Sequence, residues 1–157
     1  MNYSGKKTLL IISTVALGFT LTATALAKSS PEEDAIEYRQ GAFKMIGHHF
    51  GAMAGMMKGK MEFDAETFKQ NAEAVATLSQ FAGNGFVDGS YEGKTRAKKD
   101  IADNMDDFKK KLETFQVEAA NLAKAAEGAS DLEGLKPAFG AVGQSCKACH
   151  KAYRGKK

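Results

Sequence analysis

The sequence has no tryptophan, no run of alternating apolar and polar residues, and only two cysteines. Alternation is the pattern of half-buried strands, so its absence excludes a β fold. The basic residues are not gathered into a stripe with aromatic residues between them, which argues against nucleic acid as a partner. After residue 27 no stretch is apolar enough to cross a bilayer, so we expect no membrane anchor in the mature chain.

Residues 1–27 predict a secretory signal peptide that is cleaved. Lys6 and Lys7 form its basic start, an apolar run follows from residue 9 to about residue 21, and a small-residue site ends at Ala27. The run is shorter than the roughly 20 residues of a membrane-spanning helix, and an acidic segment comes soon after it. We therefore expect cleavage after Ala27 and a single mature domain, residues 28–157, in the periplasm.

Loss of this leader changes the charge of the protein. The whole chain carries a formal net charge of +3, but without Lys6 and Lys7 it has 20 basic and 19 acidic residues, a formal charge of +1. The lysine-rich tail at the C-terminus is expected to be solvated. The basic composition alone therefore says little about partners.

Four segments of the mature chain place apolar residues at helical spacing. The first begins with Ser30 as the start of a capping box, has Pro31 at its first helical position, and should end near Gly59. The second begins after Asp64, whose side chain can accept a hydrogen bond from a free backbone amide, and should end at the glycines of residues 83–85. Each of these boundaries rests on a local signal.

The third segment is the most regular, with apolar steps of three and four from Ile101 to Ala126 and a stop at Gly128. The fourth should begin around residues 130–131, and it carries both cysteines on its apolar line. The connections are short except for residues 83–95, between the second and third segments. The pattern predicts an all-α protein, an antiparallel four-helix bundle of up-down-up-down topology.

Three residues of the fourth segment form a chemical cluster. Cys146 and Cys149 are the only cysteines of the chain, and His150 follows directly. Residues i, i+3 and i+4 lie on one face of a helix, so the two thiols and the imidazole should be neighbours. Such groups can form a redox dithiol, a structural zinc site, a disulfide or a covalent haem attachment.

The first three explain the cluster poorly. A redox dithiol usually has its reactive thiol at a helix N-terminus, whereas these cysteines lie near the end of their helix. A zinc site needs four ligands, and the remaining histidines, His48 and His49, point about 100 degrees apart on a helix. A disulfide between Cys146 and Cys149 would close only a small loop and would leave His150 without a role.

Covalent haem attachment uses all three residues. In the C-x-x-C-H signature the two thiols add to the haem vinyl groups, and the histidine is an axial ligand of the iron. The motif here includes every cysteine of the chain, follows an export signal and lies on the inner face of an amphipathic helix. The sequence therefore predicts one haem c, attached through Cys146 and Cys149 with His150 as the iron ligand.

With this motif at its C-terminal end, the chain resembles the class II c-type cytochromes, and in particular cytochrome c′. The resemblance is carried by VGQSCKACHKAYR and by PEEDAIEYRQGAFKMIGHHF in the first segment, and it covers essentially the whole mature chain. It implies a haem in one end of the bundle, with Arg39 and Gln40 near the propionates and Arg154 beside the proximal histidine. Part of the glycine-rich loop should cover the haem edge, with Thr95 as the candidate contact. The resemblance also implies a homodimer packed through the first two helices.

The bundle geometry is consistent with this position of Arg39. In an up-down-up-down bundle the first and last helices run antiparallel, so the start of the first lies in the same half as the end of the last. A propionate partner would explain a cation so close to the apolar line. The alternative is an ordinary solvated arginine on a helix surface.

Position 43 distinguishes two branches of the family. The resemblance implies that low-spin relatives have a methionine there as the sixth iron ligand, whereas high-spin relatives have an apolar residue that closes the distal face. This chain has Phe43, so we expect five-coordinate, high-spin iron. Met45 is turned about 200 degrees away on the helix. Met53 and Met57 continue the apolar line and are expected in the core rather than in a copper site.

An apolar distal pocket would exclude water and anionic ligands and would still admit small neutral gases. The resulting hypothesis is a periplasmic protein that binds nitric oxide or carbon monoxide and sequesters nitric oxide. The alternative is a single-electron carrier with a periplasmic redox partner, although a fast carrier usually keeps six iron ligands. An enzyme such as a peroxidase is disfavoured, because no acid-base residue is found close to Phe43.

Overall fold

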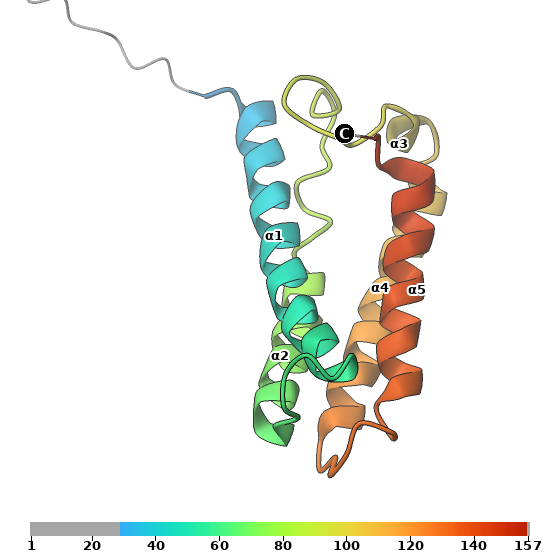
Figure 1. The fold of residues 1–157 in the computed structure, drawn as a ribbon. Coiled ribbons are helices and arrows are strands. Elements are labelled where there is room, and N and C mark those ends of the chain that lie inside the picture. Colours follow the sequence, from blue (N-terminus) through green and yellow to red (C-terminus); the bar gives the residue numbers. More distant parts are fainter. Residues whose placement is uncertain (1–28, 157) are drawn as a thin grey trace, which may run out of the picture.

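The structure, a computed structural model, describes residues 29–156. Four long helices form an antiparallel bundle, and a single short helix precedes the third of them (Figure 1). Helix α1 packs against α2, α2 against α4, and α4 against α5. The all-α, up-down-up-down prediction is confirmed. The helices are α1 (Pro31–Met57), α2 (Ala65–Ser79), α3 (Asp100–Asp103), α4 (Met105–Ala126) and α5 (Lys136–Tyr153).

Side-chain caps start the first two helices as predicted. The Ser30 hydroxyl accepts a hydrogen bond from the Glu33 amide, and the Glu33 carboxylate accepts one from the Ser30 amide, which completes the capping box. The Asp64 carboxylate accepts a hydrogen bond from the Thr67 amide at 2.7 Å. These contacts satisfy backbone donors that the helix itself leaves free.

Replacing Asp64 with alanine is expected to lower the urea midpoint of unfolding, because the Thr67 amide loses its acceptor. The hydrogen bond to Thr67 lowers the pKa of Asp64. The contribution of the carboxylate is therefore present above the ordinary aspartate pKa of about 3.9, and it is lost as the pH falls through the lower folded value. Far-UV circular dichroism in urea should show a difference from wild type that shrinks between pH 7 and about pH 3. Asp64→Asn keeps an acceptor oxygen and serves as the control; an equal difference at both pH values would contradict this assignment.

Three helix boundaries differ from the prediction. Helix α2 ends at Ser79, before the glycines, and the third helical segment is interrupted at Asn104, which has a φ of −130° and separates α3 from α4. Helix α5 begins at Lys136 rather than around residue 130. Pro137 explains the late start, since proline lacks an amide proton and fits only the first turn of a helix.

The main hydrophobic core fills the end of the bundle where α1 ends and α5 begins. Met53 is fully buried in it and Met57 packs against it, so both are core residues as predicted. A second, smaller cluster lies at the other end and includes Tyr91, Phe108 and Tyr153. The segment after α2, residues 80–99, continues in the direction of α2 toward this second end and passes between α1 and α5 (Figure 1). We call it the crossing segment.

No helix within residues 29–156 has the length and apolarity needed to cross a membrane. The predicted signal peptide lies outside the described residues.

Candidate haem site

A cavity of about 590 Å³ is lined by residues of α1, α3, α4, α5 and the crossing segment. This volume lies within the range of about 300–1,000 Å³ that is typical of ligand and cofactor sites. All the site residues predicted from the sequence line it: Arg39, Gln40, Phe43, Thr95, Cys146, Cys149, His150 and Arg154. Most of the remaining wall is apolar, with Ile46, Phe50, Phe86, Ile101, Phe108, Leu112, Phe115 and Val142.

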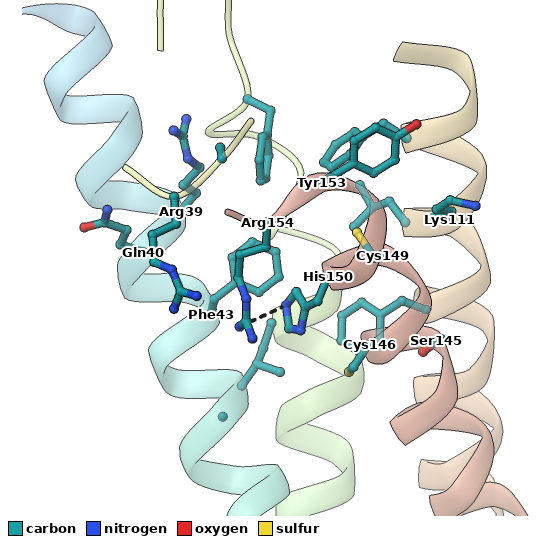
Figure 2. A pocket seen from close by; sticks show the side chains of 18 of the residues that line it. Arg39, Gln40, Phe43, Lys111, Ser145, Cys146, Cys149, His150, Tyr153 and Arg154 are labelled. Carbon is teal, nitrogen blue, oxygen red and sulfur yellow. Dashed lines mark hydrogen bonds between the residues drawn. The ribbon is translucent and has the colours of Figure 1, made fainter. Parts of the chain in front are cut away.

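The two thiols lie on the cavity side of α5 near its C-terminal end (Figure 2). Both cysteines are free and half-buried, so neither is used by a disulfide within the described residues. Burial raises the pKa of the Cys146 thiol, and burial followed by the neighbouring Cys146 raises that of Cys149. A reactive redox dithiol needs a lowered thiol pKa, so this alternative is not supported.

A structural zinc site is not supported either. Among residues 29–156, no three histidine, cysteine or carboxylate side chains are grouped closely enough to hold a metal ion. His48 is exposed, and the His49 Nδ1 lies 2.9 Å from the Asn71 Oδ1 at the α1–α2 contact. Neither histidine lines the cavity.

His150 is half-buried beside the thiols, next to Arg154 (Figure 2). Burial lowers its pKa, and the guanidinium groups of Arg154 and Arg96 lower it further. The Arg154 Nη1 lies 3.5 Å from the His150 Nε2. A neutral imidazole keeps a lone pair, which is the form that binds a metal ion. Two unpaired thiols, a neutral imidazole and apolar walls together fit a covalently attached haem.

Phe43 projects from α1 into the same cavity, across from α5 (Figure 2). The Phe86 ring meets it edge to face, with ring centroids 6.2 Å apart. Met45 is 49 % exposed and does not line the cavity, so its position gives no support to it as an iron ligand. Phe43 is therefore one of the α1 side chains on the cavity wall, and its role as the distal residue stays a prediction.

Arg39 is not the solvated arginine considered as an alternative, because only 3 % of it is exposed. Its Nη1 donates to the Gly85 carbonyl and the Ser90 hydroxyl, and its Nη2 donates to the Ser90 carbonyl and the Thr95 hydroxyl. Gln40 donates to the Lys94 carbonyl at 2.7 Å. Both α1 residues thus hold the crossing segment, while their place beside the propionates stays a prediction.

Gly85 shows how closely the crossing segment approaches α1. A Cβ at this position would lie 2.5 Å from the Ala35 carbonyl oxygen and 2.7 Å from the Arg39 Cβ. Only glycine fits such a backbone contact without displacement. The sequence predicted the glycines of residues 83–85 as the end of the second helix, but it gave no indication that Gly85 contacts α1.

The far end of the crossing segment is bound to the end of α5. The Gly155 amide donates to the Arg96 carbonyl at 2.7 Å, and the Arg96 side chain donates back to the Gly155 carbonyl. The Lys98 amide donates to the Tyr153 carbonyl at 3.0 Å. Sequence reasoning missed these contacts because they join residues about 60 positions apart.

Tyr153 fixes the same end of α5 to α4. Its hydroxyl donates to the Asp107 Oδ2 at 2.5 Å, and this hydrogen bond raises the pKa of Tyr153 to about 12. The Tyr153 ring also meets Phe108 edge to face, with centroids 5.5 Å apart. The turn of α5 that carries His150 is therefore held by the crossing segment on one side and by α4 on the other.

Nearly all of the described residues match one protein family. A family model described as cytochrome c′ matches residues 34–154. Cytochrome c′ of Alcaligenes xylosoxydans is 43 % identical over 125 residues, which cover 80 % of this chain and 96 % of the relative. The solved cytochrome c prime of Shewanella frigidimarina is 44 % identical with a TM-score of 0.78, covering 82 % of this chain and 100 % of that one.

A third similarity concerns a complex with a gas. The nitric oxide complex of a mutant cytochrome c prime from Alcaligenes xylosoxidans has a TM-score of 0.75 and 41 % identity, over 83 % of this chain and 100 % of that one. The family match spans both the C-x-x-C-H motif and the α1 residues of the cavity. The chain therefore belongs to the cytochrome c′ family, whose members carry haem c.

Proposed function

We propose that this chain is a periplasmic haem protein with five-coordinate, high-spin iron that binds nitric oxide and carbon monoxide, and that its role is to sequester nitric oxide. Haem c, when bound, supplies an iron that can take a diatomic gas. Cys146 and Cys149 would hold the haem covalently, and His150 would be its protein ligand. The remaining residues of the cavity would decide which molecules reach the other face.

The proposal depends on one observation, the position of the Phe43 side chain in the cavity. This side chain projects from α1 into the cavity, and a phenyl ring can neither donate a hydrogen bond nor bind iron (Figure 2). Phe86 and Ile46 extend the apolar wall around it. Water and anions lose their hydration in such a place without gaining a partner, whereas a small neutral gas has little hydration to lose.

The cavity offers little to an enzyme mechanism of the peroxidase type. Its described lining contains no aspartate or glutamate, and His150 is the one histidine in it. General acid-base catalysis near neutral pH most often uses a histidine or a carboxylate within reach of the bound substrate. Since His150 is the expected iron ligand, the lining supports a binding protein. The nitric oxide complex of a relative supports the same ligand class.

One observation favours the second candidate, a single-electron carrier. A shallow hollow beside His150 is lined by basic side chains, and within residues 29–156 none of them forms an ion pair: Arg96, Lys147, Lys151, Arg154 and Lys156. An acidic periplasmic protein would complement this surface. Gas binding remains the leading function, because Phe43 supplies no sixth ligand.

A homodimer is also part of the proposal. Tyr38 and Met45 lie seven residues apart on α1, so they share one helix face, and they are 47 % and 49 % exposed. A contact between two copies through α1 and α2, the first two helices, would cover them. Sedimentation velocity of the purified protein measures this directly; a monomer at micromolar concentration would contradict the dimer.

Visible spectra of the protein matured in a host that attaches c-type haem are the first test. We expect high-spin spectra in the ferric and ferrous forms and a shift of the ferrous Soret band when nitric oxide is added. A low-spin ferrous spectrum that nitric oxide leaves unchanged would show that a sixth ligand is present. That result would overturn the gas-binding proposal in favour of electron transfer.

A further inference from the structure

Three side chains connect the crossing segment to the distal wall. The Arg39 guanidinium lies over the Phe86 ring, 4.8 Å from its centroid. Phe86 in turn meets Phe43 edge to face at 6.2 Å. A buried guanidinium over an aromatic face is attracted by the ring quadrupole, and edge-to-face rings attract each other in the same way. Arg39, Phe86 and Phe43 thus form a continuous contact, which we call the Arg39 relay.

The first member of the relay is fixed strongly. Arg39 makes hydrogen bonds to Gly85, Ser90 and Thr95, and burial lowers its pKa without removing its charge at neutral pH. These acceptors flank Phe86 in the chain. The same guanidinium therefore fixes the backbone on both sides of Phe86 and contacts its ring.

The last member of the relay is held less firmly. Phe43 is only half-buried, and Phe86 is the one aromatic ring that meets it within residues 29–156. Phe86 is supported from behind by Phe108, whose ring centroid lies 4.6 Å away. If Phe86 moved, the Phe43 ring would lose its neighbour on that side and gain rotamer freedom.

We propose that Arg39 is a positioning residue which, through Phe86, holds the Phe43 ring over the distal face and so slows the arrival of small gases there. The inference rests on the proposed function, because it concerns the same distal face. It assigns to Arg39 a task separate from the predicted propionate contact. A lysine could not replace it, since one ammonium cannot make the forked contacts to Gly85, Ser90 and Thr95.

Carbon monoxide association with the ferrous protein, followed after laser flash photolysis, tests the relay. Arg39→Gln and Phe86→Leu should each raise the association rate about tenfold, the size expected for coupling through packed intermediates. In a Phe43→Ala background, the same two substitutions should change the rate by less than about twofold, because the ring on which they act is gone. An equal increase in both backgrounds would show that Arg39 acts on the gas without Phe43, and the proposal would fail.

Two controls separate positioning from loss of stability. Asp64→Ala weakens α2 at the other end of the bundle and should leave carbon monoxide association unchanged. Phe86→Leu leaves every Arg39 hydrogen bond in place, so amide exchange of residues 85–95 should stay close to wild type while the association rate rises. If only Arg39→Gln raised the rate, and did so together with faster exchange in this segment, opening of the segment and not ring position would be the cause.

Crystal structures of the Arg39→Gln and Phe86→Leu variants without gas supply an independent readout. We expect the Phe43 ring to be displaced or to occupy a second rotamer in both. An unchanged ring would overturn the relay even if carbon monoxide bound normally. If the wild-type protein took up no carbon monoxide while the ring moved as expected, the proposed function would fail and the relay would survive as a structural feature only.

Discussion

Phe43→Met is expected to convert the protein from high-spin to low-spin, six-coordinate haem in the ferrous form. Phe43 lies on the cavity wall across from α5, and a methionine there has a flexible side chain ending in a thioether that can bind iron. A sixth ligand would also compete with gases, so nitric oxide and carbon monoxide should bind far more slowly. Visible and magnetic circular dichroism spectra measure the spin state.

Phe43→Leu is the matched control for this experiment. Leucine is close to methionine in size but has no sulfur, so the high-spin spectrum should persist. A Phe43→Met protein with the spectrum of wild type would mean that residue 43 does not face the iron. Since the gas-binding proposal depends on that residue, it would then lose its main support.

Replacing both cysteines with serine should remove haem from the denatured chain completely. Cys146 and Cys149 are free, lie three residues apart and line the cavity beside His150, so each is placed to form one covalent link. Mass spectrometry of the denatured protein should show the mass of the polypeptide alone. The double variant should also unfold at lower temperature, because unlinked haem can dissociate and stabilises the fold only as far as its concentration and affinity allow.

Single replacements refine this result. Cys146→Ser and Cys149→Ser should each retain one link and therefore some haem after denaturation. Ala148→Ser changes an exposed residue between the cysteines that does not line the cavity, and it should behave as wild type. Haem retained on the double serine variant under denaturing conditions would contradict attachment through these thiols.

Local signals explain why much of the fold was predictable. The capping box at Ser30 and the cap at Asp64 depend on residues three positions away, and both were read correctly. The start of α5 was not, because Leu132 and Leu135 continue the apolar spacing although they belong to a turn. The core requires apolar residues from that turn as well as from the helix, so apolar spacing alone could not place the boundary.

The candidate site also has one part that local signals predict, the C-x-x-C-H motif, and one part that they do not, the contacts of Arg39. The C-x-x-C-H motif is contiguous, so Cys146, Cys149 and His150 could be grouped from spacing alone. The partners of Arg39 lie 46 to 56 residues further along the chain, in a segment without regular structure. The path of such a segment is determined by tertiary contacts, and no periodic pattern in the sequence predicts it.

The close approach of Gly85 to α1 also determines where this protein can accept new sequence. At Gly85 even one added carbon would meet the backbone of α1, so substitutions there should be rejected. A few residues later, Val87, Asp88 and Gly89 are exposed, as are Glu92 and Gly93. Peptide tags or recognition sequences inserted at these exposed positions would extend into solvent, because none of the five residues lines the cavity.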